Sequence, residues 1–284
     1  MGTALALALS EQRYDVCAMV TRRRASLRKA IRLLPQVSVA LTSDEVAGLP
    51  KVDLILIATP DDAIATAAEQ LAGALSSNAR SVTVLHTSGA LSSAELQPLA
   101  AIGCNVGSIH PLISVSDPKA GAADLKNAYF CLEGDRSALR IARQLVDDLG
   151  ATSFSIKADQ KALYHAAAVM SSGHVTALFD ITIEMLVHAG LTNDEARRIL
   201  LPLLESTWKN LARFDPADAL TGTFARGDEA TVQKHLAALT ASDHEEALAI
   251  YRLLGLRSLE LFAEKGGDKK TIERLREIVT PEAD

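Results

Sequence analysis

The chain has 284 residues, which is enough for two domains of ordinary size. Hydrophobic residues make up 48% of it but aromatic residues only 4%, so its core must be aliphatic, as is typical of helices packed on a parallel sheet. The net charge of −6, with no lysine-rich arm or basic stripe, argues against nucleic acid as a partner.

The first half of the chain alternates short β-branched runs with stretches of helical pattern. The runs predict buried strands over 16–20, 37–41, 52–57, 82–85, 106–109, 129–132 and 152–156. The stretches between them predict helices over 3–14, 25–34, 61–75, 92–101 and 136–149. This alternation predicts an open, doubly wound, Rossmann-like sheet in residues 1–156.

From residue 157 to residue 284 only helical periodicity remains, which predicts a helical second domain. Two S/T-x-x-E capping boxes, beginning at Thr192 and Ser242, mark expected helix starts. A long helix is expected over 158–189, with Ser171-Ser172-Gly173 as a candidate bend or close-packing point. No stretch reaches about 18 uncharged apolar residues, so we expect no membrane span.

The three cysteines are widely spaced and form no C-x-x-C pair. Cys17, Cys104 and Cys131 are therefore interpreted as buried thiols of a protein that resides in the reducing cytoplasm.

A nicotinamide cofactor would contact three places in such a fold. Gly2 and Thr3 open the first helix, where a pyrophosphate would lie on the helix N-terminus. Arg22 and Arg23 follow a strand where an NAD enzyme would carry an acidic residue, and arginine suits a 2′-phosphate, so NADP is favoured over NAD. The alternative is a solvated basic helix start.

Thr59-Pro60 follows the strongest strand and marks a helix start with proline at the first helical position. Because this is the carboxyl end of a strand, we also consider Thr59 and Pro60 candidates for lining the cofactor.

Two histidines end neighbouring strands and should emerge at the same edge of the sheet. His86, with Ser88 close behind it, and His110 are candidates for a polar role toward a substrate, and a structural role is the alternative. No spacing around them completes a metal site, so no metal is expected.

The long helix carries the candidate catalytic residues Lys161, His165 and Ser172. At about 100° per residue they fall within about 40° of one another on one face. Lysine and histidine are recognised acid/base groups, whereas the alternative is a polar stripe facing solvent or a domain interface.

The segment from Ala219 to Asp228 is a loop rich in turn formers and hydroxyl groups. Asp228 is placed to cap the next helix, which leaves Thr221, Gly222 and Arg226 as candidates for binding an anionic ligand across a domain cleft.

Several ordered segments of the chain are those of a known family. HTSGA, GSIHPL, KALYHAAAV, LTGTFARGD and VQKHLAAL resemble Rossmann-like oxidoreductases with a C-terminal domain of unknown function 2520. That family is similar in layout to pyrroline-5-carboxylate reductase and to the 6-phosphogluconate and β-hydroxyacid dehydrogenases. The resemblance implies an NADP domain followed by a helical domain that forms a homodimer, but no particular substrate.

Two positions depart from the family pattern. Ser172-Gly173 stands where Ser-Asn is usual, and Thr221-Gly222-Thr223 stands where Thr-Gly-Pro is usual. The dehydrogenase relatives carry an asparagine four residues after the helix lysine, whereas here His165 follows Lys161 at that spacing. An equivalent role for the pair is therefore a hypothesis.

These observations favour NADP-dependent hydride transfer to or from a small carbonyl, imine or hydroxy compound, with Lys161 and His165 as the acid/base pair. The alternatives are a non-catalytic nucleotide-binding or regulatory protein and an acid/base enzyme without redox chemistry. We further expect Met1 to be an internal residue of a longer protein, because Gly2 fits the third glycine of G-x-G-x-x-G. The first strand and the first two glycines would then lie in about 10 residues upstream.

Overall fold

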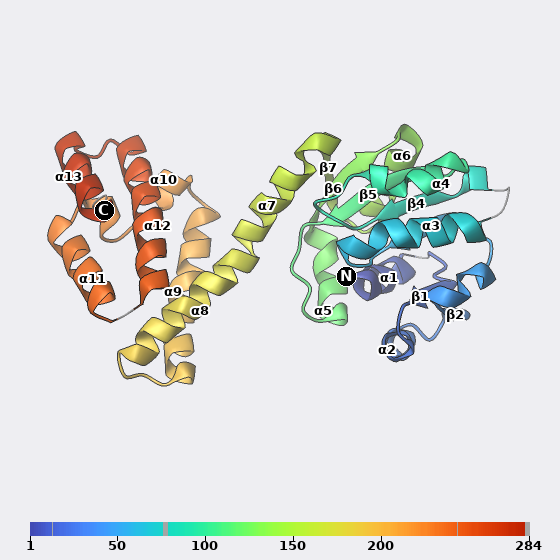
Figure 1. The fold of residues 1–284 in the computed structure, drawn as a ribbon, viewed down its shortest axis with the longest axis horizontal. Coiled ribbons are helices and arrows are strands. Elements are labelled where there is room, and N and C mark those ends of the chain that lie inside the picture. Colours follow the sequence, from blue (N-terminus) through green and yellow to red (C-terminus); the bar gives the residue numbers. More distant parts are fainter. Residues whose placement is uncertain (13, 76–78, 243, 282–284) are drawn as a thin grey trace. The chain divides into compact units, whose positions relative to one another are not determined.

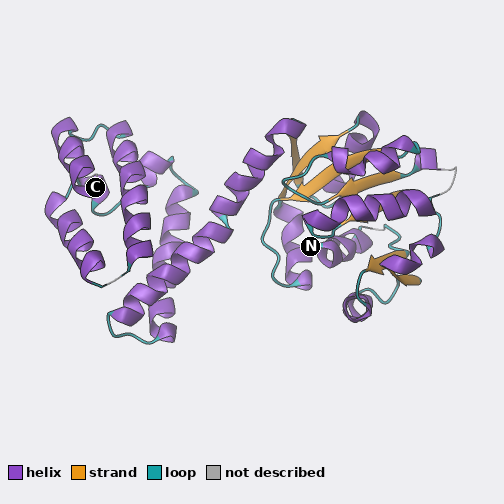
Figure 2. Ribbon diagram, in the orientation of Figure 1, coloured by secondary structure: helices purple, strands orange, loops and turns teal. Residues whose placement is uncertain are grey.

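The computed structural model describes residues 1–12, 14–75, 79–242 and 244–281. It divides into two compact units, Met1–Ser172 and Gly173–Asp284, which Figure 1 shows in blue to green and in yellow to red. In the described residues all strands belong to the first unit, and the second is helical (Figure 2). Helix α7 (Lys161–Ser171) belongs to the first unit, whereas the sequence placed residues 157–171 in the second domain.

The strands form two sheets instead of the one expected. β1 (Ala18–Thr21) and β2 (Val39–Thr42) make a parallel pair. The other strands form a five-stranded sheet in chain order, β3 (Leu54–Ile57), β4 (Thr83–His86), β5 (Asn105–Pro111), β6 (Tyr129–Gly134) and β7 (Thr152–Ser155). Among the described strand pairs of this sheet, β5–β6 alone is antiparallel, because the chain turns back after β5 through α5 (Pro118–Asp124), a helix that the sequence pattern did not predict.

Helices cover both faces of the larger sheet. Ile109 and Phe130 pack toward α1 (Gly2–Glu11) and α6 (Arg136–Asp148) in one apolar core. Val84 and Val106 face the other core, formed with α3 (Ile64–Ala74) and α4 (Gln97–Ala101). Strand β4 is buried along its whole length, as expected of a central strand whose side chains alternate between two covered faces. A smaller core joins α1 to the β1–β2 pair and the end of α2 (Arg24–Leu33).

The predicted long helix is present but interrupted. α7 ends at Ser171, and α8 (Gly173–His188) begins two residues later. Ser172 between them has φ −130° and ψ −74°, which is not helical. The helix is therefore interrupted at Ser172, within the Ser171-Ser172-Gly173 triplet, where the two compact units also divide.

The second unit is built on a core of aliphatic side chains from its last three long helices. Its helices are α8, α9 (Asn193–Leu211), α10 (Pro216–Ala219), α11 (Glu229–Ala241), α12 (Glu245–Glu264) and α13 (Lys269–Val279). Val232, Leu259 and Leu275 are fully buried where α11, α12 and α13 meet. The expected capping box at Thr192 is formed with Glu195. The one expected at Ser242 is not, because that hydroxyl donates to the carbonyl of Leu239 and α12 starts after His244.

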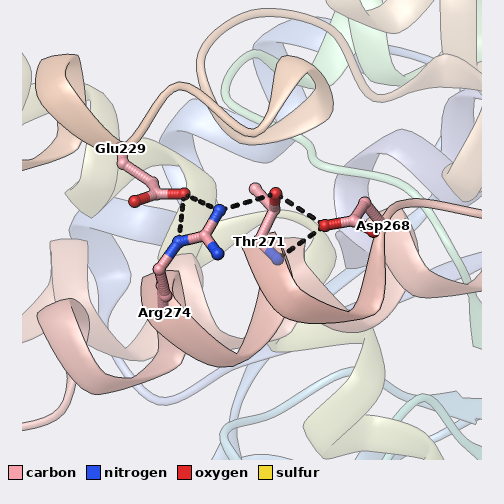
Figure 3. Close-up of polar contacts among 4 residues, drawn as sticks. All are labelled: Glu229, Asp268, Thr271 and Arg274. Carbon is pink, nitrogen blue, oxygen red and sulfur yellow. Dashed lines mark hydrogen bonds and ion pairs between the residues drawn. The ribbon is translucent and has the colours of Figure 1, made fainter.

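Polar contacts tie α11 to α13 at their exposed ends (Figure 3). Asp268 accepts hydrogen bonds from the backbone N–H and the hydroxyl of Thr271, both at 2.9 Å, and so caps α13. One turn later, Arg274 pairs with Glu229 at the start of α11 at 2.7 Å. The cap and the ion pair fix how α13 begins against α11.

One helical segment among the described residues, Ala158–His188, is long and apolar enough to cross a membrane by length and composition. Its apolar window has a mean hydropathy of 1.3, and only 6% of the window is buried. The segment qualifies on mean hydropathy, because its alanine-, leucine- and valine-rich turns outweigh the polar side chains among them, and it contains no unbroken run of 18 apolar residues. A large apolar helix face is left uncovered within the single chain.

Candidate active site

Polar side chains gather where β4 and β5 end at one edge of the larger sheet. The two strands are parallel neighbours, and His86 stands opposite Ser108 in their register. The first turns of α7 contribute further polar groups there through hydrogen bonds to both strand ends. We call this group the polar cluster, and it consists of His86, Ser88, Ser108, His110, Lys161, Tyr164 and His165.

Lys161 is the most deeply enclosed member of the polar cluster. Its side chain is 0% exposed, and its ammonium group donates to the Ser88 carbonyl at 3.1 Å and to Ser108 Oγ at 2.8 Å. Burial lowers the pKa of Lys161, and the negative charge of Glu133 opposes this shift. The ammonium therefore ties α7 to the ends of β4 and β5, and its partner Ser108 is fully buried as well.

Glu133 on β6 supports the contact between Lys161 and Ser108. Its carboxylate accepts from the backbone N–H and the hydroxyl of Ser93, both at 2.7 Å, and from the Ser108 hydroxyl at 3.5 Å. Ser108 thus accepts from Lys161 and donates to Glu133, so the buried positive charge is linked to a carboxylate through one hydroxyl. Such pairing is what makes a buried ammonium tolerable.

His86 is fully buried and uses both ring nitrogens inside its own loop. Its Nδ1 accepts from the backbone N–H of Ser88, and its Nε2 lies 3.0 Å from the carbonyl of Ser92, to which it donates. Burial lowers the pKa of His86, as suits a neutral ring with this pattern. In this conformation His86 has a structural role, which was the alternative to a polar role toward a substrate. Its hydrogen bonds shape the loop that contains Ser88 and Gly89.

His110 and His165 are both half-buried and meet at the more exposed side of the polar cluster, which we call its open side. Their ring centroids are 5.7 Å apart and the rings are nearly perpendicular. His110 Nδ1 lies 2.7 Å from the hydroxyl of Tyr164. Gly89 closes the group, because a Cβ placed there would come within 2.5 Å of His165 Cδ2 and 2.8 Å of His110 Nε2. Only a glycine lets the loop after β4 approach both rings.

The candidate cofactor residues of the first helix lie beside the end of β3. A Cβ at Gly2 would be 2.9 Å from the Cβ of Ala58, so the start of α1 approaches the chain just before Thr59 and Pro60. No side chain caps this helix start, whose first-turn N–H groups include that of Thr3. The four candidate residues are therefore gathered at one point, with backbone donors suited to an anion.

The arginines after β1 differ in their pairing. Arg24 forms an exposed ion pair with Glu45 at 3.1 Å. Among the described residues no ion pair is found for Arg22 or Arg23, and both are exposed. Their guanidinium groups are free to meet an anionic ligand or solvent.

The remaining predicted site residues are not part of the polar cluster in the unit that contains it. Ser172 lies two turns beyond His165, about 10 Å along the helix. Thr221, Gly222 and Arg226 belong to the helical unit, where Gly222 has a φ of +84° and Asp228 caps α11 as expected. Within the described part of the chain, no group of three metal-ligating side chains occurs.

Sequence reasoning missed Tyr164, Ser108 and Glu133 as members or neighbours of the site. Tyr164 and Ser108 lie inside the segments KALYHAAAV and GSIHPL, and Tyr164 is three residues from Lys161, which places it on a neighbouring face of the helix. Glu133 carries no local signal, since only the pairing of β5 with β6 brings it near Ser108. A charged residue in a buried strand was the one available hint.

The fold and the polar cluster together define a Rossmann-like domain followed by a helical domain. Residues 1–111 match the model of a Rossmann-like domain, and residues 128–258 match that of a domain of unknown function (DUF2520). This is the domain pair that the sequence resemblance indicated. No curated protein matches the sequence.

Solved structures share the fold over nearly the whole chain. Protein TM1727 from Thermotoga maritima is 22% identical with a TM-score of 0.69, covering 91% of this chain and 96% of its own. BF3122 from Bacteroides fragilis, whose description as an NADP oxidoreductase is provisional, is 21% identical with a TM-score of 0.70, covering 92% and 93%. Pyrroline carboxylate reductase from Plasmodium falciparum, solved with NADP bound, is 12% identical with a TM-score of 0.56, covering 99% and 95%. The chain thus has the fold of nicotinamide-dependent oxidoreductases.

Proposed function

We propose that this protein is an NADP-dependent oxidoreductase that acts on a small carbonyl, imine or hydroxy compound. The observation that carries the proposal is the polar cluster itself, in which a buried lysine and two imidazoles meet at the carboxyl edge of a Rossmann-like sheet. Ligands of doubly wound folds bind at this edge. The oxidoreductase fold of the solved relatives supports the reaction class.

NADP, when bound, supplies or accepts the hydride at its nicotinamide ring. In our proposal its pyrophosphate lies on the uncapped start of α1, at Gly2 and Thr3, with Thr59 and Pro60 beside it. Arg22 and Arg23 pair with the 2′-phosphate.

His165 is the group we assign to exchange a proton with the substrate oxygen or nitrogen, since it lies at the open side of the polar cluster. Lys161 lies one turn earlier and is enclosed, so it supports the proton transfer through its charge and through Ser108. His86 and Ser88 shape the loop, and His110 orients the substrate. Ser172, Thr221, Gly222 and Arg226 remain proposed substrate-binding residues.

The catalytic proposal is tested by following NADPH absorbance with a panel of oxo acids and cyclic imines. Once turnover is found, His165→Gln and Lys161→Ala should each lower kcat/KM at least 100-fold, as general acid/base groups usually contribute that much. His174→Gln, on the exposed start of α8, is the matched control and should retain activity. Turnover that survives Lys161→Ala and His165→Gln unchanged would show that the assignment is wrong.

Cofactor choice is measured separately by calorimetry with NADPH and NADH. Arg22 and Arg23 should favour NADPH by about tenfold, which corresponds to about 1.4 kcal/mol. Replacing both by alanine should remove this preference, while Arg28→Ala, an exposed arginine of α2, should keep it. Equal affinities for NADPH and NADH in the unaltered protein would show that Arg22 and Arg23 do not select for the 2′-phosphate.

The enclosure of Lys161 favours a second candidate, a nucleotide-binding protein without catalysis. Its ammonium has protein partners and no exposed surface, as a purely structural lysine would. NADPH binding without turnover on any compound of the panel would favour this candidate. Turnover of a substrate without NADPH oxidation would instead favour an acid/base enzyme that performs no redox chemistry.

We also propose that the protein is a homodimer formed through its helical unit. Large apolar side chains are exposed on α9 and α12, including Leu203 at 64% and Leu253 at 70%. Exposed apolar surface of this extent marks an interaction site. We propose a second copy rather than lipid as the occupant, because the described segment that is apolar enough to span a bilayer, Ala158–His188, also carries Asp180 and Glu184. Three free cysteines support a reducing, cytoplasmic location.

A further inference from the structure

His110 and Tyr164 form a close pair in the polar cluster. The Tyr164 hydroxyl lies 2.7 Å from His110 Nδ1, and the rings meet edge to face with centroids 5.6 Å apart. His110 ends β5, whereas Tyr164 is on the first turn of α7, which Lys161 anchors to the same strand through Ser108. Tyr164 is held from its other side by Phe154 of β7, at 5.8 Å between ring centroids. The geometry of the pair is thus set by three elements.

Both members of the pair are neutral at pH 7. Burial, with the charges of His165 and Lys161, lowers the pKa of His110 to about 4, so its imidazole carries one proton. Burial raises the pKa of Tyr164, so its phenol keeps its proton. One hydrogen therefore lies between Tyr164 and Nδ1, and it comes either from the phenol or from the ring.

The phenol is the better donor of the two. A phenol O–H is far more acidic than the N–H of a neutral imidazole, and the imidazole nitrogen is the stronger acceptor. With the phenol as the donor, Nδ1 of His110 accepts its hydrogen. The single ring proton of His110 then lies on Nε2.

The Nε2 edge of the half-buried His110 ring lies against Gly89. A Cβ at Gly89 would be 2.8 Å from Nε2 and 2.9 Å from Cε1, so this edge borders a glycine rather than a larger side chain. Among the described residues, Nε2 is not one of the buried polar atoms that lack a partner. His86 uses both nitrogens within its loop, so His110 is the strand-end histidine with a ring nitrogen left for a ligand.

We propose that Tyr164 is a positioning residue that holds His110 as the Nε2–H tautomer, so that the site offers a hydrogen-bond donor to a carbonyl or carboxylate oxygen. The ligand class rests on the proposed function, whereas the tautomer does not. An acceptor oxygen beside this N–H would be oriented, and polarised if it belongs to the reacting carbonyl.

The tautomer is read directly by long-range ¹H–¹⁵N correlation NMR on the full-length, ¹⁵N-labelled protein at pH 7, with His110→Gln to assign the resonances. We expect a protonated Nε2 and an unprotonated Nδ1 in the unaltered protein. Tyr164→Phe should move His110 toward a mixture of the two tautomers. An Nδ1–H form in the unaltered protein would overturn the proposal whether or not any variant folds, and so would an unchanged tautomer in a folded Tyr164→Phe protein.

The chain contains its own control pair. His235 Nδ1 lies 2.8 Å from the Tyr251 hydroxyl in the helical unit, with the rings also edge to face. Tyr251→Phe should change the signals of His235 and leave those of His110 unchanged. A change at His110 in this variant would show that the effect of Tyr164→Phe is a general disturbance, and the proposal would then fail.

The ligand class is tested with pyruvate and methylammonium as probes in the same NMR measurement. Pyruvate, which carries acceptor oxygens, should shift the His110 signals in a saturable manner, and methylammonium at equal concentration should not. A response to methylammonium alone, or to neither probe up to 100-fold excess, would overturn the assigned ligand class. Neither result depends on NADPH turnover, so failure here is distinct from failure of the proposed oxidoreductase.

Discussion

Gly89 is the residue at which the loop after β4 touches two imidazole rings. A methyl group there would overlap His165 and His110, and both are held by contacts to α7 or β5. The loop can approach both rings because residue 89 carries a hydrogen atom in place of a side chain. The approach itself follows from the pairing of β4 with β5.

Gly89→Ala should therefore destabilise the protein, by about 1–3 kcal/mol, as overpacking does when rings must shift. Urea unfolding measures the change. Gly73→Ala in α3 is the control, because nothing lies within 4 Å of its added Cβ and alanine is the better helix former. Equal stabilities of the two variants would mean that the rings give way freely at Gly89.

The lowered pKa of His110 makes the stability of the protein depend on pH. In the folded state this ring takes up a proton only near pH 4, whereas in the unfolded chain it does so near its ordinary value of 6.5. Below pH 6.5 the unfolded state thus binds more protons, so stability should fall as the pH drops toward 4. Burial is the main cause of the lowered pKa of His110, the charges of His165 and Lys161 add to it, and Asp61 opposes it.

Urea unfolding at pH 7 and pH 4.5 tests this in the unaltered protein and in His110→Gln. The unaltered protein should lose roughly 2 kcal/mol more than the variant between the two pH values. Because the carboxylates and His86 are present in both proteins, the difference between their two losses of stability reports His110. Equal losses would mean that His110 titrates normally in the folded state.

At the scale of elements, the loop that joins α10 to α11 is held by contact with α12. Phe224 of this loop packs against Gly255 in the middle of α12, where an added Cβ would come within 2.8 Å of the Phe224 ring. The ring also meets Tyr251 one turn earlier, at 5.8 Å between centroids. The glycine therefore sets how closely the segment LTGTFARGD approaches the helix.

Gly255→Ala should push Phe224 away and destabilise the helical unit by about 1–3 kcal/mol. Phe224→Leu in the same chain should restore part of this loss, since the shorter side chain leaves room for the methyl group. Thermal unfolding of Gly255→Ala, of Phe224→Leu and of the double variant, compared with the unaltered protein, forms a double-mutant cycle. Strictly additive losses would show that the two residues are not coupled.

At the scale of the whole molecule, α9 and α12 expose large apolar side chains, and this exposure needs an explanation. Such residues lie at Ile199 and Leu203 on α9 and at Leu253 and Leu254 on α12. Scattered apolar residues are normal on a surface, whereas several on adjacent turns indicate an interface. We infer that a second copy of the chain covers them.

Light scattering should find a dimer, and Leu203→Glu with Leu253→Glu should shift it to a monomer of about half the mass. Ile102→Glu, an isolated exposed residue of the first unit at 37% exposure, should leave the dimer intact. A monomeric unaltered protein would contradict the interface. Flotation of the unaltered protein with liposomes would instead favour lipid as the occupant of the apolar helices.

The sequence by itself determined the order and type of most elements and one gathering of polar residues. Strands show in it because a buried parallel strand is a short β-branched run, and the helix start at Thr192 shows because capping is local. His86 and His110 were expected at one sheet edge, since parallel strands end on the same side, and Lys161 and His165 were expected on one face of the long helix. Such signals depend only on residues close along the chain.

The tertiary structure alone decided how these residues divide their work. It enclosed Lys161 between Ser88 and Ser108, used both nitrogens of His86 within a loop, and placed Tyr164 on His110. It also split the strands into two sheets and turned β6 against β5, which brought Glu133 to Ser108. These outcomes depend on contacts between segments far apart in the chain, and a hydrogen-bond partner chosen across such distances leaves no periodic pattern in the sequence.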